Sequence, residues 1–168
     1  MKGIIIYKTK YGTTEKYAEL IADETGLDAV NIDRFDIKDI YKYDYIVIGS
    51  PTYAYGLIAG GWIKKNKKTL LNKKVFLFSV GGIPAEDKDM LNKIAINSIG
   101  KDLFSHITYC HCRGVFKYNK LSFGDKLLMK IAIFLTKSPD GKKKMLEGYD
   151  LFDKVYVGSL INDIKALK

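Results

Sequence analysis

The sequence predicts an α/β fold in which a parallel β-sheet carries helices on both faces. Two observations support this prediction. Short continuous apolar runs, typical of strands buried on both sides, alternate along the chain with segments whose apolar residues recur at helical spacing. The 168 residues are 47% hydrophobic, which suits one globular core. We therefore expect a single domain over residues 1–168, with a sheet of five strands.

The first half of the chain supplies three of these strands. Ile4 to Tyr7 and Tyr45 to Gly49 are continuous apolar runs, and Asp28 to Asp33 is a weaker strand between them. Thr14 to Glu24 carries an apolar helical stripe and is followed by Gly26, a residue that favours helix ends.

The second half continues the alternation. Ala59 to Leu71 and Asp87 to Ile99 are predicted helices that flank a strand at Val75 to Ser79. A last strand at Ile107 to Cys112 precedes a final helix at Asp150 to Leu167.

One segment, residues 114–148, interrupts this alternation. It is too long for a simple loop in a compact domain, so we expect it to carry structure of its own, with a helix from about Phe123 to Thr136. Eight lysines and three acidic residues give the segment a net charge of +5. A helix rich in apolar residues and lysines could lie on an anionic membrane surface, or it could pack on this domain or on a second subunit.

Three polar loops follow predicted strands: TKYGTT, SPTYAYG and SVGGIP. Ligands of open parallel sheets bind at the carboxyl ends of the strands, where these loops would meet. In the first loop, the hydroxyls of Thr9, Thr13 and Thr14 and the backbone at Gly12 could hold a phosphate at a helix N-terminus. The alternative is a helix cap at Thr13 or Thr14 that needs no ligand. The spacing matches neither the dinucleotide-binding motif nor the P-loop.

The other two loops add surfaces suited to a planar ring. Tyr53 and Tyr55 could lie against such a ring, or they could simply cover the edge of the core. The glycines of SVGGIP expose backbone amides, or they form an ordinary turn. Together the three loops suggest a flat cofactor that carries a phosphate.

With these motifs, the chain resembles the flavodoxin family. TKYGTT is similar to its phosphate loop and GSPTYAYG to its loop beside the flavin. The segments YGTTEKYAELIA, KKVFLFSVGG and YNKLSFGDKLLMK look closer to the branch that includes the FMN-dependent protoporphyrinogen oxidase of bacteria. The resemblance implies a flavodoxin-like three-layer sandwich with strand order 2-1-3-4-5, and FMN as cofactor.

The resemblance also implies which residues contact FMN. The phosphate loop departs from the family pattern at Tyr11, and Lys10 adds a positive charge beside it. The candidate cofactor-binding residues are Thr9, Lys10, Tyr11, Gly12, Thr13, Thr14, Ser50, Pro51, Thr52, Tyr53, Ala54, Tyr55, Gly56, Ser79, Val80, Gly81 and Gly82. No separate catalytic residue is expected, because a flavin carries the redox chemistry itself.

Two functions follow from the resemblance. The first is an oxidoreductase, similar to protoporphyrinogen oxidase, that passes electrons from a small reduced substrate to a quinone or another acceptor. The alternative is an electron carrier that serves reductase partners. The net charge of +9 favours the first function, since carriers of this family are typically acidic. A third interpretation is a basic interaction module that has lost its flavin.

The remaining sequence features exclude or limit other classes. The basic residues are almost all lysine and no nucleic-acid motif occurs, so we expect no nucleic-acid partner. His106, Cys110, His111 and Cys112 lie close together in sequence, but two thiols that share one strand face do not make a zinc site, and we expect no metal. The short apolar start favours a cytoplasmic protein, peripheral on the inner face of the cell membrane if the basic segment binds lipid.

Overall fold

The computed structural model describes residues 1–167, and Lys144 in its backbone only. Five parallel strands form the sheet: β1 (Gly3–Tyr7), β2 (Ala29–Asn31), β3 (Tyr45–Tyr53), β5 (Lys74–Gly81) and β6 (Ile107–Arg113). They pair in the order β2-β1-β3-β5-β6, and a short strand, β4 (Gly56–Leu57), pairs antiparallel with β3. Counted without β4, this is the predicted order 2-1-3-4-5, so the predicted fold is confirmed.

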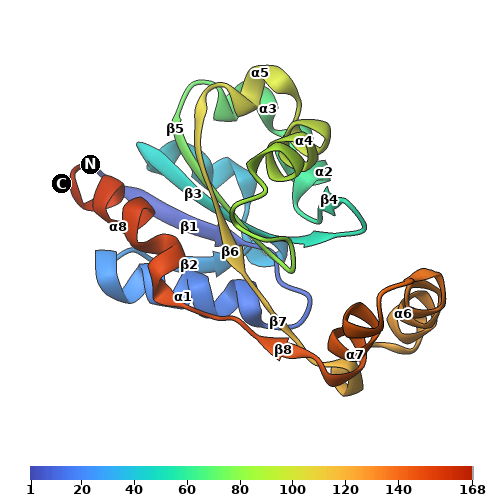
Figure 1. Ribbon diagram of the computed structural model, residues 1–168. Helices are drawn as coiled ribbons and strands as arrows, with labels where there is room; N and C mark the ends of the chain where they lie inside the picture. The colour runs from blue at the N-terminus through green and yellow to red at the C-terminus, as the bar shows by residue number, and fades with distance from the viewer. Residues whose placement is uncertain (168) are drawn as a thin grey trace.

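Helices cover both faces of this sheet (Figure 1). On one face, α1 (Thr13–Thr25) and α8 (Gly158–Lys165) pack on the odd-numbered residues of β3 and the even-numbered residues of β5 through residues such as Tyr17 and Leu160. The other face carries α2 (Gly60–Lys65), α3 (Lys67–Leu70), α4 (Lys88–Ile99) and α5 (Lys101–Phe104). Successive strand residues point to opposite faces, so each strand contributes to both apolar clusters.

Short 3₁₀ helices connect several of these elements. They are η1 (Ile32–Arg34), η2 (Ile37–Lys42), η3 (Tyr118–Lys120) and η4 (Lys154–Val157).

The segment after β6 forms a separate arm beyond the sheet (Figure 1). Strands β7 (Val115–Phe116) and β8 (Tyr149–Asp150) pair antiparallel at its base. They lead into and out of two helices, α6 (Phe123–Leu135) and α7 (Pro139–Glu147). The predicted helix at Phe123 to Thr136 is confirmed almost to the residue, whereas α7 and the β7–β8 pair were not predicted.

Three predicted boundaries are wrong. The loop SPTYAYG is largely a β-hairpin, because β3 continues to Tyr53 and turns back into β4. The helix predicted over Ala59 to Leu71 divides at Asn66, whose side-chain amide donates to the carbonyl of Trp62 at 2.8 Å. The final helix begins at Gly158 rather than Asp150, because Asp150 pairs with β7.

Candidate functional site

The parallel register brings the ends of three strands to one edge of the sheet. Tyr7 lies opposite Gly49, which in turn lies opposite Phe78, and Pro51 lies opposite Val80. The loops that leave β1, β3 and β5 therefore start side by side, as expected for a ligand-binding edge.

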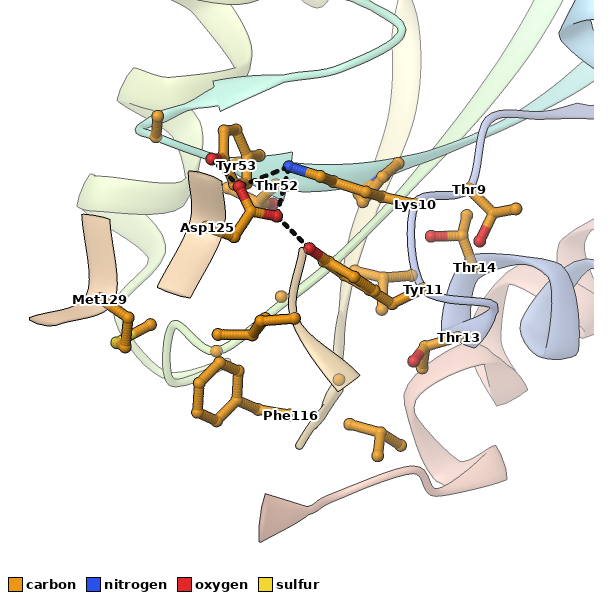
Figure 2. A pocket seen from close by; sticks show the side chains of 18 of the residues that line it. Thr9, Lys10, Tyr11, Thr13, Thr14, Thr52, Tyr53, Phe116, Asp125 and Met129 are labelled. Atoms are coloured by element: carbon orange, nitrogen blue, oxygen red, sulfur yellow. Dashed lines mark hydrogen bonds and ion pairs between the residues drawn. The ribbon is translucent and has the colours of Figure 1, made fainter. Parts of the chain in front are cut away.

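A cavity of about 500 Å³ lies at this edge, a volume within the range of small-molecule sites. Its walls come from the three strand-end loops on one side and from the arm on the other (Figure 2). The predicted residues that line it are Thr9, Lys10, Tyr11, Thr13, Thr14, Pro51, Thr52, Tyr53, Ala54, Tyr55, Val80, Gly81 and Gly82.

Four predicted residues do not line the cavity but support its walls. Gly12 and Gly56 lie in the turns that carry their neighbours. Ser50 is fully buried and accepts a hydrogen bond from the Ala59 amide at 3.0 Å. Ser79 is also fully buried and hydrogen-bonds to side chains of β6.

The N-terminus of α1 has free donors at the cavity. Gly12 precedes the helix at a φ of 86°, a conformation that favours glycine, and no side chain caps the helix. In contrast, Asp87 and Ser122 cap α4 and α6. The first amides of a helix have no hydrogen-bond partner within the helix. Among the described residues, the hydroxyls of Thr13 and Thr14 form no hydrogen bond with another group. Helix caps at Thr13 or Thr14, the alternative considered from the sequence, are thus not observed.

The β3–β4 hairpin turns through Ala54 and Tyr55, which both have positive φ, at 47° and 60°. Such two-residue turns usually contain Asn or Gly, so this backbone is strained. Next to the turn, the hydroxyl oxygen of Thr52 is buried without a hydrogen-bond partner among the described residues. The hairpin thus combines a strained turn at the cavity wall with a buried hydroxyl that has no hydrogen-bond partner among the described residues.

The loop after β5 needs glycine at Gly81. A Cβ atom there would lie 3.0 Å from Cβ of Thr52, so a side chain would crowd the hairpin. A Cβ at Gly82 would lie 2.2 Å from the Tyr149 hydroxyl. Because a side chain at Gly81 or Gly82 would crowd these neighbours, the backbone of the loop faces the cavity.

His111 of β6 contacts the same loop through a hydrogen bond to its backbone. The Ile83 carbonyl can only accept, so Nε2 of His111 carries the proton and donates to it at 3.1 Å. Nδ1 then accepts from the Ser79 hydroxyl at 2.7 Å. Burial, with the nearby Arg113 charge adding to it, lowers the pKa of His111 to about 4, so the ring is neutral at pH 7.

The arm supplies the rest of the cavity wall, and the sequence analysis did not assign these residues to the site. They are largely apolar: Gly114, Val115, Phe116, Leu121, Asp125, Leu128, Met129, Ala132 and Tyr149. Their apolar character was visible in the sequence, but it did not reveal that α6 folds back over the strand ends.

Asp125 is the contact that joins α6 to the three-loop edge (Figure 2). The carboxylate, 8% exposed, accepts from Lys10 at 2.7 Å, from the Tyr53 hydroxyl at 2.5 Å and from the Tyr11 hydroxyl. The Lys10 ammonium also lies 3.6 Å from the centre of the Tyr53 ring. Burial opposes ionisation of Asp125, but these three donors outweigh it and hold the carboxyl pKa well below its usual range.

The cysteines of β6 and His111 of the same strand lie on opposite faces of the sheet. Cys110 and Cys112 pack on the α1 and α8 face, whereas His111 points to the other face. Residues 1–167 contain no group of three or more His, Cys, Asp or Glu side chains placed to hold a metal ion. Burial raises the pKa of the Cys112 thiol, which suits a packing role.

Sequence comparisons identify known proteins that are similar to this chain. A family model described as the flavodoxin domain matches residues 4–144. An uncharacterized protein of Methanocaldococcus jannaschii is 35% identical over 121 residues, which are 70% of this chain and 79% of that protein. A flavodoxin of Nostoc is 36% identical over 61 residues, so the match spans 34% of this chain and only 36% of that flavodoxin.

Solved structures share the fold. Two-electron reduced flavodoxin of Megasphaera elsdenii aligns with a TM-score of 0.50 at 21% identity, over 65% of this chain and 82% of that one. The Trp repressor binding protein of Bacillus subtilis aligns with a TM-score of 0.51 at 18% identity, over 82% of this chain and 99% of that one. At these identities the similarity concerns the fold alone.

Replacing Asp125 by Asn should release the arm from the edge of the sheet. The substitution removes the charge that holds Lys10 and weakens the bonds from Tyr11 and Tyr53, a loss of about 2 kcal/mol. We expect amide hydrogen exchange in α6 to become roughly tenfold faster or more, while exchange in β1 and β3 stays unchanged.

The control for this experiment is Asp140→Asn, which removes an exposed carboxylate from α7 on the same arm. Unchanged exchange in α6 of the Asp125 variant would show that the carboxylate does not hold the arm.

His111 should make the stability of the fold depend on pH between about 6.5 and 4. Between these values the unfolded chain binds a proton at this residue and the folded chain does not, so stability falls as the pH falls. Relative to His111→Gln, the wild type should lose up to about 3 kcal/mol across this range, measured by urea unfolding. The exposed His106, replaced by Gln, is the control, and parallel profiles for wild type and His111→Gln would contradict the assignment.

Proposed function

The chain belongs to the flavodoxin domain family, and we propose that it binds FMN in the cavity at the strand ends and acts as an electron carrier. The observation on which this proposal rests is the uncapped start of α1, which opens into the same cavity as the hairpin and the glycine loop. The flavodoxin of Nostoc that is 36% identical over 61 residues supports it.

The donor set at the start of α1 fits a phosphate monoester. The backbone amides at the start of α1 and the hydroxyls of Thr9, Thr13 and Thr14 are neutral hydrogen-bond donors. Together with the helix dipole, they suit a doubly charged anion. One of these hydroxyls, on Thr9, already accepts from the Gly12 amide at 3.0 Å, which shapes the turn. Asp125, a carboxylate that lines the cavity, is already paired with Lys10.

The other walls fit a planar ring. Pro51 to Tyr55 would flank it, and the backbone of Val80 to Gly82 would offer amide donors and carbonyl acceptors to its polar rim. Phe116 of the arm adds a further aromatic side chain to those of Tyr53 and Tyr55 in the hairpin. FMN, once bound, supplies the redox chemistry, and these residues orient it and limit its contact with water.

The charge of the chain bears on its redox partners. A carrier with a net charge of +9 would be attracted to partners whose docking surfaces are acidic. We expect electron transfer to such a partner to slow as salt is added, because salt screens the attraction.

The second candidate is an oxidoreductase similar to the FMN-dependent protoporphyrinogen oxidase of bacteria. The apolar wall formed by Leu121, Leu128, Met129 and Ala132 favours it, because this wall could hold a small apolar substrate beside the flavin. Such an enzyme would pass electrons from the reduced substrate to a quinone or another acceptor.

Anaerobic assays of the FMN-loaded protein separate the two candidates. If it is a carrier, its dithionite-reduced form should pass electrons to a redox protein with an acidic docking surface, and it should not oxidise protoporphyrinogen with a quinone as acceptor. Turnover of protoporphyrinogen at a catalytic rate would instead support the enzyme.

Binding of FMN should depend on its phosphate. We expect the protein to bind FMN far more tightly than riboflavin, which lacks the phosphate, in titrations followed by flavin fluorescence. Thr14→Val should weaken FMN binding roughly tenfold through the loss of one hydrogen bond to a charged group, and should leave riboflavin binding unchanged.

Thr108→Val, at an exposed position of β6, is the matched control and should bind FMN as the wild type does. A protein that stays colourless and does not quench FMN fluorescence would refute the proposed function.

A further inference from the structure

Helix α6 leaves a row of large apolar side chains uncovered. Phe123 is 88% exposed and Phe134 is 83% exposed, and Leu127 and Ile131 are each at least half exposed. These four residues recur every three or four positions, so they form one stripe along the helix. A stripe of this size in water marks an interaction surface.

This stripe faces away from the cavity. Asp125, Met129 and Ala132 line the cavity, and they also recur every three or four positions. They lie on the side of the helix opposite Phe123, Leu127 and Phe134, since the two sets are offset by about half a helical turn. The contacts of Asp125 therefore hold α6 with its apolar stripe directed away from the cavity.

Lysines border the same stripe. Lys126 and Lys130 lie four residues apart on α6, which places them along one side of the exposed apolar residues, and Lys137 follows just after the helix ends. Lys130 and Lys137 are exposed, and α7 adds the exposed Lys142 and Lys143. The surface therefore combines apolar side chains with a strong positive charge.

We propose that this face of α6, defined by Phe123, Leu127, Ile131 and Phe134 with Lys126 and Lys130, docks on an anionic lipid bilayer together with Lys137 just beyond the helix. Apolar side chains would enter the boundary of the acyl chains while the lysines pair with lipid phosphates. Within residues 1–167 no helix is long and apolar enough to span a membrane, so α6 would lie in the plane of the surface.

Charge argues for lipid over a second copy of the chain. Two copies meeting through this face would bring together two arms of net charge +5 each, and the repulsion would oppose the pairing. An anionic bilayer has the opposite charge and an apolar interior, so it complements both parts of the surface.

The proposal is tested by flotation of the full chain with vesicles. Wild type should float with vesicles of phosphatidylcholine and phosphatidylglycerol, but not with phosphatidylcholine alone, and added salt should weaken the binding. Phe123→Ser with Phe134→Ser should lower the partition coefficient roughly tenfold or more. Lys130→Glu with Lys137→Glu should lower it to a similar extent.

Each variant has a control elsewhere on the surface. Tyr41→Ser removes an exposed aromatic side chain from η2, and Lys65→Glu with Lys68→Glu makes the same charge change on α2 and α3. The controls should float as the wild type does. Circular dichroism checks that every variant is folded. FMN titration tests the proposed cofactor site separately, so a failure of membrane docking and a failure of FMN binding can be told apart.

Three results would overturn the proposal. The first is a wild type that does not float with anionic vesicles, and the second is equal flotation of the wild type and both arm variants. The third is a wild type that does not float and sediments as a dimer that Phe123→Ser with Phe134→Ser converts to monomer, since the face would then be an interface between copies.

Discussion

The register of the parallel sheet is the constraint on which the rest of the structure depends. Because Tyr7, Gly49 and Phe78 lie opposite one another, the loops that follow them start at one edge. Each loop on its own has an ordinary structural explanation. Their convergence places the free amides of α1, the strained hairpin and the bare backbone of the glycine loop around one cavity. A slip of one residue would exchange the side chains that fill the two apolar clusters, so the packing of both faces also fixes the site.

The sequence predicts most of this edge, because its signals are local. Apolar runs identify the strands, and hydroxyl and glycine residues identify the loop before α1. The hairpin at Ala54 and Tyr55 was missed because neither residue is typical of a turn with positive φ. The role of Asp125 could not be predicted, since its partners Lys10 and Tyr53 are distant in sequence and no local pattern records the contact.

Asp125 also explains how a basic, apolar arm can belong to the site without belonging to the core. Among the described residues of α6, Asp125 is the one that is buried, and most of the large apolar side chains of the helix remain exposed. A single carboxylate with three donors is a directional connection, whereas apolar packing alone would allow the helix to slide. The arm therefore has a defined orientation although little of it is buried.

The pairing of α1 with α8 has a consequence for synthesis of the chain. Tyr17 and Ile21, near the start, are buried together with Leu160 and Ile164, near the end. At ordinary elongation rates, on the order of ten seconds separate translation of the two helices. During that interval one face of the nascent sheet is covered by α1 but not by α8. Its exposed apolar residues must avoid aggregation until α8 has left the ribosome.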